Sequence, residues 1–212
     1  MSVLQRIAHF QNRQDDIPNQ ELARDLAARK DASGIYEIAE NLWNMDQNIQ
    51  ADCIKVLYEI GYIDPSLIEE YAEDFLKLLG FSNNRLVWGG MIALSTIAEK
   101  NADFIHAHLP DVLRALNTGS VITVDNAVKT LALAASSEEY RASMFPHLLE
   151  HLRNCRPKDV PQHAEKTLPA VDASNRDDFI TVLEKRMEDL SSAQITRVKK
   201  VIKAAKTLST DD

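Results

Sequence analysis

The sequence predicts an all-α protein built as an α-α superhelix, a solenoid of about six antiparallel helix pairs. Apolar residues return every 37 positions along the chain, and such self-similarity is typical of stacked repeats, because each repeat buries its apolar face only against its neighbours. The composition agrees, since 212 residues include only 6 Gly and 7 Pro and no segment alternates as a strand does. The clearest apolar column consists of Leu57, Leu94, Leu131, Leu168 and Ala205.

Other apolar columns show that each repeat is a pair of helices. Two further columns lie on the apolar side of the same helix as the first column. Two others fit the apolar side of a different helix, so one repeat contains two amphipathic segments. The columns in the first phase are Cys53, Gly90, Ala127, Ala164 and Val201, and Ile60, Ile97, Ala134, Val171 and Leu208. Those in the second phase are Leu42, Leu79, Leu116 and Leu190, and Ile38, Phe75, Val112 and Leu149.

The whole chain, residues 1–212, is expected to form one helical-repeat domain, because the period runs almost to its end without a linker. Residues 1–30 are expected to form two atypical helices, broken around Asp15 to Pro18, that cap the stack. Residues 33–208 then form five repeats of 37 residues. The predicted first helices span 33–44, 65–80, 102–117, 138–154 and 175–190, and the second helices span 47–61, 83–100, 120–136, 158–173 and 192–208.

Capping residues support these boundaries. Asp64 precedes Pro65, the combination favoured where a helix begins. Ser191 and Gln194 have the spacing of a capping box, in which each side chain satisfies a backbone N–H at the start of the helix. Asn175 stands before two aspartates in the same way. These signals place helix starts near 65, 176 and 192.

The third and fourth repeats resemble the HEAT and armadillo families of helical repeats. They carry a proline in the first helix and an Ala-x-x-x-Leu pattern in the second. The matching residues are Leu109-Pro110-Asp111-Val112-Leu113 with Leu116, Ala127 and Leu131, and Phe145-Pro146-His147-Leu148-Leu149 with Ala164 and Leu168. The resemblance covers roughly residues 33–208 and implies a HEAT-like solenoid that serves as a scaffold or binding surface.

The chain departs from the family at the turn between the two helices. Gln50, Val87, Val124 and Pro161 stand where the family usually has arginine. The sequence therefore does not support the family's usual ladder of hydrogen bonds between repeats.

One exposed column of the second helices is rich in lysine. At 100° per residue, its positions lie opposite the core stripe, and four of its five residues are lysine. In a stacked solenoid such a column forms a ridge along the concave face. With its neighbouring columns, it gives the residues expected to bind a partner, which are Lys55, Trp88, Ile92, Asn126, Lys129, His163, Lys166, Lys199 and Lys203.

Charge is distributed unevenly over the chain. The net charge is −8, yet the predicted second helices sum to +4 and leave −12 for the remainder. The excess lies in the last helix, which contains Arg197, Lys199, Lys200, Lys203 and Lys206 without a carboxylate. Such a field can attract an acidic protein segment or a phosphate backbone. Alternatively, this helix is only solvated on its exposed side, and its lysines favour the helix dipole.

Trp88 has two interpretations. With Ile92 one turn further on, and with Lys55 and Lys129 beside it, Trp88 has the composition of an apolar anchor in a binding hot spot. Otherwise the ring folds sideways over the adjacent repeat, and the following glycine pair only lets helices pack closely.

No metal, cofactor or catalytic residue is expected. His147, His151 and Cys155 recur at a spacing compatible with metal ligands on one helical face, but the sequence offers no evident fourth ligand. None of the six histidines is followed by Glu, the pair with which deoxyhypusine hydroxylases hold iron, and no phosphate loop or nucleophile elbow is present.

A HEAT-like DNA-binding protein or DNA glycosylase is the alternative. The resemblance would then give Trp88 and either Asp52 or Asp125 the roles of lesion-side aromatic and carboxylate. A pI near 5.3 disfavours nucleic acid, because lysine and arginine contacts to phosphate supply most duplex affinity.

The sequence as a whole favours a non-catalytic protein–protein interaction scaffold or adaptor that binds a protein partner, with an acidic segment, on its concave face. No stretch has the length of a signal peptide core or a membrane span. Cys53 lies in a core column far from Cys155, so both thiols are expected to be reduced. A cytoplasmic protein is therefore expected, with its oligomeric state open.

Overall fold

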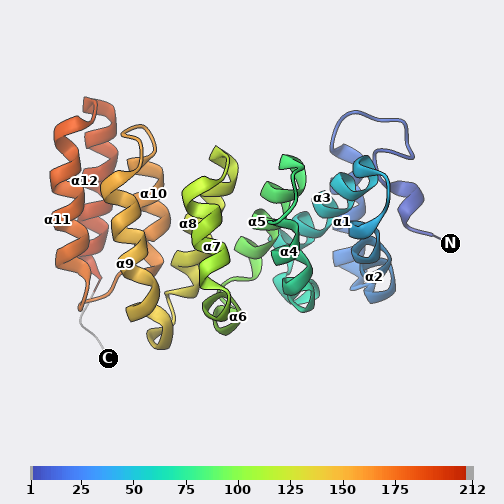
Figure 1. Cartoon of the computed structure of the whole chain (residues 1–212), viewed down its shortest axis with the longest axis horizontal. Helices are drawn as coiled ribbons and strands as arrows, with labels where there is room; N and C mark the ends of the chain where they lie inside the picture. The colour runs from blue at the N-terminus through green and yellow to red at the C-terminus, as the bar shows by residue number, and fades with distance from the viewer. Residues whose placement is uncertain (1, 209–212) are drawn as a thin grey trace.

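The computed structural model describes residues 2–208, and all regular elements in that range are helical. The helices stand side by side in chain order along the long axis of the molecule, with the two ends of the chain at opposite ends of the stack (Figure 1). The predicted all-α superhelix is therefore confirmed. Within the described range it has five helix pairs, preceded by a single α-helix.

The elements follow the predicted alternation of first and second helices. The α-helices are α1 (Ile17–Arg29), α2 (Ala32–Glu40), α3 (Gln47–Ile63), α4 (Ala72–Leu78), α5 (Asn84–Ile97), α6 (Ala102–Ala107), α7 (Leu109–Thr118), α8 (Val121–Ala134), α9 (Glu138–Asn154), α10 (Val160–Thr167), α11 (Arg176–Arg186) and α12 (Ser192–Thr207). Short 3-10 helices lie at Leu4–Arg6, Asn41–Trp43, Pro65–Leu67, Glu69–Tyr71, Leu168–Ala170 and Met187–Asp189. The second helices of the five pairs are α3, α5, α8, α10 and α12.

Two of the predicted first helices are broken. The segment predicted as 65–80 contains two 3-10 helices before α4, and the segment predicted as 102–117 is divided into α6 and α7 at His108. Pro110 explains the second break, because proline cannot donate the helical hydrogen bond and its ring clashes with the carbonyl four residues before it, that of His106. The cap at Asp64 is present, since its side chain accepts from the amide of Ser66, but it begins a 3-10 turn.

The first of the two predicted N-terminal helices is also absent. Apart from the 3-10 turn at Leu4–Arg6, residues 2–16 are irregular, and Asn12 has a left-handed φ of 51°. The run from Gln11 to Asp16 contains no apolar residue, so a helix there would have no face to bury. Side chains of α1 and α3 hold this segment instead: Asp52 accepts from the amide of His9 at 2.7 Å, and Asn19 accepts from that of Ala8 at 2.9 Å.

The predicted columns form the core. Leu57, Leu94, Leu131 and Ala205 are each fully buried, and Leu168 is half-buried. The buried residues join into a single cluster from one end of the stack to the other. Cys53 is buried in this cluster, and neither cysteine is in a disulfide.

The glycine pair in α5 is required for close packing. A Cβ atom on Gly90 would lie 2.7 Å from the carbonyl oxygen of Phe75 in α4, and one on Gly89 would lie 2.9 Å from Cγ2 of Ile54 in α3. Real Cβ atoms essentially never approach this closely. The two glycines therefore let α5 approach both neighbouring helices.

Repeats are linked by hydrogen bonds, but not through the position where the family usually has arginine. Gln162 of α10 donates to Asp125 of α8 at 2.8 Å, and Asn83 donates to Gln47 of the preceding repeat at 3.2 Å. These links join residues 36 or 37 positions apart, which is close to one repeat period.

Replacing Leu131 with Ala should lower the free energy of unfolding by about 2–5 kcal/mol, because it leaves a cavity in the fully buried core of α8. Ile122→Ala, in the same helix but 45% exposed, is the matched control and should cost much less. Urea denaturation measures both. Equal losses would contradict the assignment of the core face of α8.

Gly90→Ala should destabilise the protein by about 1–3 kcal/mol through overpacking, although alanine is the better helix former. Gly80→Ala is the control, since its added Cβ would be 3.5 Å from its nearest neighbour, an ordinary contact. Thermal unfolding should show a clear loss for the first variant only. A Gly90→Ala protein as stable as the parent would show that α4 and α5 can separate at no cost.

Candidate binding surface on the second helices

The surface formed by the solvent-facing side chains of α3, α5, α8, α10 and α12 is here termed the second-helix face. The structure places the nine predicted contact residues at different depths in it. Lys199 and Lys203 are exposed; Lys55, Trp88, Asn126, Lys129 and Lys166 are half-buried; and Ile92 and His163 are buried, at 8% and 2% exposure. Ile92 and His163 therefore offer a partner little surface.

Aromatic rings gather where α3 meets α5. The Trp88 ring lies 6.5 Å from that of Tyr58, which lies 6.0 Å from that of Tyr62. Tyr58 is almost fully buried, whereas Tyr62 is 53% exposed. Trp88 thus packs beside Tyr58 of the preceding repeat and stays half-buried, so that part of its side chain is accessible.

Lys55 is neutralised by acidic neighbours. Its ammonium lies 2.7 Å from Glu59 and 3.4 Å from Asp16, and it sits 4.8 Å above the centre of the Tyr58 ring. Burial disfavours the charged form, but hydrogen bonds to Glu59 and Tyr58 outweigh it and hold the pKa of Lys55 above its ordinary value. Lys55 consequently adds little free positive charge to the face.

Lys129 has no such neutralising neighbour. Its half-buried side chain extends from α8 across α5, so that Nζ lies 5.4 Å from the centre of the Tyr62 ring on α3. It forms no ion pair within 4.0 Å with any residue of the 2–208 range. Burial lowers its pKa, because a partly desolvated ammonium is disfavoured. An accessible cation is therefore held on an aromatic ring without an anion.

Lys166 lies close to Lys129. Its ammonium donates to the backbone oxygen of Asp125 at 2.9 Å and lies 3.8 Å from the carboxylate of the same residue. Burial lowers the pKa of Lys166, Asp125 acts in the opposite direction, and the charge of Lys129 lowers it further. The Asp125 carboxylate therefore pairs with Lys166 and not with Lys129, which leaves the charge of Lys129 unbalanced.

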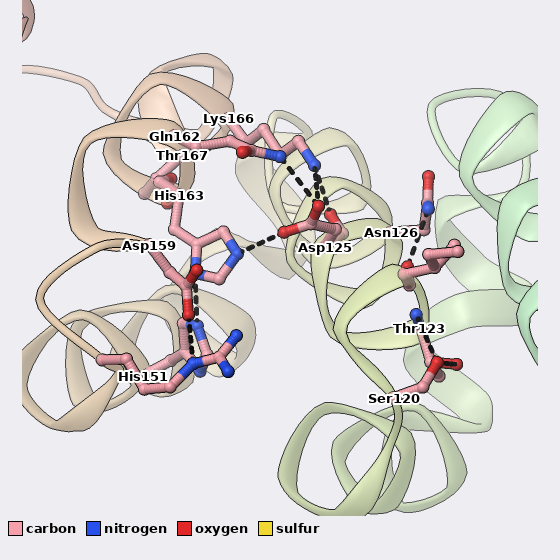
Figure 2. Close-up of polar contacts among 12 residues, drawn as sticks. Ser120, Thr123, Asp125, Asn126, His151, Asp159, Gln162, His163, Lys166 and Thr167 are labelled. Carbon is pink, nitrogen blue, oxygen red and sulfur yellow. Dashed lines mark hydrogen bonds and ion pairs between the residues drawn. The ribbon is translucent and has the colours of Figure 1, made fainter.

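Asp125 organises the contacts between α8 and α10 (Figure 2). One carboxylate oxygen is 2.7 Å from Nε2 of His163, and the other accepts from Gln162 at 2.8 Å. The other ring nitrogen of His163, Nδ1, is 2.9 Å from Nε2 of His151 on α9. His163 is thus satisfied on both sides by protein groups.

The two carboxylates considered for a glycosylase are both engaged. Asp125 is bound as above, and Asp52 accepts from the amide of His9 at 2.7 Å and from Asn19 at 2.9 Å. A carboxylate fixed by such donors is poorly placed to activate water or stabilise a substrate cation.

The remaining predicted contacts lie toward the C-terminal half. Asn126 donates to the carbonyl of Ile122 at 2.8 Å, which leaves its amide directed along α8. Lys199 and Lys203 are in no ion pair with residues 2–208, whereas Arg197 binds Glu165 through two hydrogen bonds of 2.5 and 2.6 Å. α12 thus presents four exposed lysines, Lys199, Lys200, Lys203 and Lys206, and uses Arg197 to contact α10.

The group of potential metal ligands differs from the three residues that were considered, and not favoured, from their spacing in the sequence. The potential ligand atoms of His151, Cys155 and His163 all lie within 4.8 Å of one another, and His147 is not part of this group. Burial, and then the neighbouring His163, lower the pKa of His151 to about 4. Burial also raises the pKa of the Cys155 thiol, which argues against a thiolate nucleophile.

Sequence reasoning missed Tyr58 and Tyr62. Both are at helical spacing from Lys55 on the same side of α3, three and seven positions further on, and this spacing could have indicated them. No sequence signal indicated that Lys129 reaches Tyr62 across α5, because this contact depends on how three repeats stack.

None of the helices described between residues 2 and 208 is both long and apolar enough to cross a lipid bilayer.

Comparison with solved structures places the fold among armadillo/HEAT-type repeats. An engineered protein matches with a TM-score of 0.65 at 19% identity over 98% of each chain. A computationally designed armadillo repeat protein for modular peptide recognition gives 0.67 at 14% identity, over 95% of this chain and 98% of that one. A designed armadillo repeat protein in complex with the peptide (KR)4 gives 0.67 at 17% identity, over 96% of each chain. No protein-family model matches the sequence, and neither does any curated protein.

Asp125→Ala should lower the free energy of unfolding by about 1–3 kcal/mol, because it leaves the buried Nε2 of His163 and the amide of Gln162 without an acceptor. Asp111→Ala is the control, since Asp111 pairs only with exposed Arg114 and such surface pairs contribute about 0–1 kcal/mol. Denaturant unfolding of the two variants gives the comparison. A loss for Asp125→Ala no larger than that of the control would mean that the network adds nothing to stability.

Proposed function

We propose that this chain is a non-catalytic scaffold that binds an extended, acidic segment of a protein partner on its second-helix face. The observation that carries the proposal is the half-buried ammonium of Lys129, held over Tyr62 beside Lys166, with no acidic side chain within 4.0 Å among residues 2–208.

A carboxylate is the group best suited to this position. The ammonium of Lys129 has already lost part of its hydration on folding, so a partner's carboxylate regains electrostatic energy without paying that desolvation again. Charge-assisted hydrogen bonds of this kind are roughly twice as strong as neutral ones. A phosphate could also pair with Lys129, but the net charge of −8 opposes the approach of a polyanionic duplex.

Exposed aromatic surface supplies the apolar part of the contact. Tyr62 is 53% exposed and Trp88 is half-buried, so both can cover apolar atoms of a bound segment. Tyrosine and tryptophan are enriched at the residues that dominate binding energy. The combination favours a segment that places an apolar side chain close to a carboxylate.

The comparisons are in keeping with this function. Two of the similar structures are described as designed for peptide recognition or as bound to the peptide (KR)4. That peptide carries positive charge. The accessible lysines of the second-helix face in this chain are also positively charged. The same type of face would therefore select a peptide of opposite charge in this chain.

The absence of catalysis is part of the proposal. Asp52 and Asp125 are both bound by donors of the chain, and the Cys155 thiol is held in its protonated form by burial. Both cysteines are free, which is in keeping with the reducing conditions of the cytoplasm.

A labelled peptide of alternating Glu and Leu should bind more tightly than its Lys and Leu counterpart. Lys129→Gln should lower the affinity for the acidic peptide about tenfold, equivalent to about 1.4 kcal/mol. Trp88→Ala should lower it by a similar factor. Fluorescence anisotropy at two salt concentrations measures both, and affinity should fall as salt rises. Lys129→Gln should not lower the unfolding temperature, because it removes a partly desolvated charge.

Lys77→Gln is the matched control, because Lys77 is exposed on α4 and paired with Glu73. It should bind like the parent protein. Equal binding of the two peptides, or an equal loss in Lys77→Gln, would contradict the proposal. In affinity capture from cell lysate, a signal that disappears on nuclease treatment would instead support the DNA-binding alternative.

A further inference from the structure

A group of soft and borderline metal ligands lies where α9 meets α10. His151 lies in the last turn of α9, and Cys155, the C-cap residue of this helix, follows four positions later. His163 comes from α10, and it is only 2% exposed. The three ligand atoms lie within 4.8 Å of one another.

A tetrahedral site requires distances between ligand atoms that fall between the 2.9 Å of the histidine pair and the 4.8 Å that bounds the whole group. Zn–N bonds of about 2.0–2.1 Å and Zn–S bonds of about 2.3 Å place two ligand nitrogens about 3.4 Å apart, and nitrogen and sulfur about 3.6 Å apart. Nε2 of His151 and Nδ1 of His163 are now 2.9 Å apart, as a hydrogen-bonded pair (Figure 2). Small rotations of the two rings and of the Cys155 side chain would therefore make room for an ion.

The surroundings already orient the ligands. Nε2 of His163 is 2.7 Å from Asp125, so that Nδ1 is directed at His151 (Figure 2). A carboxylate on the far nitrogen of a metal-binding histidine is the usual second-sphere arrangement at zinc sites.

The cysteine is fixed by its backbone. The guanidinium of Arg186 on α11 donates to the carbonyl of Leu152 at 2.6 Å and to that of Cys155 at 2.9 Å. These bonds close the C-terminal end of α9, where the carbonyls lack helical partners. The position of Cys155 is consequently set by a neighbouring repeat.

We propose that His151, Cys155 and His163 form a binding site for Zn²⁺, with Asp125 as a positioning residue. Two imidazoles and one thiolate suit zinc, a borderline-soft ion that prefers four-coordinate sites of nitrogen and sulfur. The proposal is independent of the peptide-binding function. It departs from the expectation that the chain holds no metal, and its ligands include His163 and exclude His147.

Binding of Zn²⁺ requires the loss of one proton and the movement of another. Cys155 gives up its thiol proton and forms the Zn–S bond as a thiolate. His151 moves its ring proton from Nε2 to Nδ1, so that the lone pair of Nε2 meets the metal. His163 keeps its proton on Nε2, toward Asp125, and binds through Nδ1. One proton is therefore released for each ion bound.

The fourth position faces a cavity. The cavity has a volume of about 250 Å³, and its lining includes all three ligands together with Asn154, Arg156 and Asp159. Asp159 is held 2.6 Å from Arg156, so the space is not filled by a fourth protein ligand. A water molecule or an added small ligand can complete the coordination.

The first experiment measures metal binding by the full chain, kept reduced and treated with chelator. Competition with a chromophoric chelator gives the affinity for Zn²⁺, and thermal unfolding is compared with and without the ion. Zn²⁺ should raise the unfolding temperature, since it binds only the folded arrangement. Co²⁺ should give the visible bands of a tetrahedral ion and a thiolate-to-cobalt charge-transfer band.

The variants distinguish the two possible trios. Cys155→Ser should abolish the charge-transfer band. His151→Gln or His163→Gln should lower the affinity for Zn²⁺ by at least about 100-fold. His147→Gln, on the same helix as His151, should bind Zn²⁺ as tightly as the parent protein does. Asp125→Asn should weaken binding about 10–100-fold while the cobalt spectrum keeps its form. Because His163 is buried, His151→Gln, at a half-exposed residue, keeps the test valid should His163→Gln unfold.

The proposal would be overturned by a Co²⁺ complex without a thiolate band, by no rise in unfolding temperature with Zn²⁺, or by a loss in His147→Gln as large as that in His151→Gln.

Discussion

Each helix pair of this chain can bury its apolar side only against the next pair, and the rest of the structure depends on this constraint. Leu57, Leu94 and Leu131 are fully buried at equivalent positions of successive repeats, within one continuous core. Because the contacts are between neighbours, the chain extends as a stack, and a long surface remains available along the second helices. The glycine pair of α5 follows from the same constraint, since the close approach of α3, α4 and α5 leaves no space for a Cβ atom at Gly89 or Gly90.

Stacking also determines which charges of the second-helix face are available to a partner. Lys55 and Lys129 occupy equivalent positions, two repeats apart, but their surroundings differ. Lys55 is matched by Glu59 on its own helix and by Asp16 from the N-terminal segment, whereas Lys129 reaches over α5 to an aromatic ring. Lysines with uniform spacing in the sequence therefore differ in the structure, because Lys55 is neutralised and Lys129 is not.

The contact between α8 and α10 is centred on Asp125. Asp125 joins the helices through Gln162, His163 and Lys166, and the same carboxylate orients the histidine that meets His151. The junction is therefore held by a polar network in which each buried group has a partner, and networks of this type are rigid because breaking one bond leaves a costly unsatisfied group. A metal ion at the histidine pair would link α9 and α10 directly and leave the contact with α8 in place.

The sequence by itself determined the fold class, the register of the repeats and the identity of the core, because burial between neighbours imposes a period that is visible in Leu57, Leu94 and Leu131. It also indicated Lys129 as a solvent-facing residue. Only the tertiary structure decided that Lys129 lies on Tyr62, that Ile92 and His163 are buried, and that His163, instead of His147, meets His151 and Cys155. The periodicity specifies which side of a helix a residue occupies, whereas these contacts depend on the distance and angle between different repeats. For the same reason the sequence could not show that residues 2–16 are mostly irregular. The side chains of Asp52 and Asn19 hold this segment by accepting hydrogen bonds from its backbone amides.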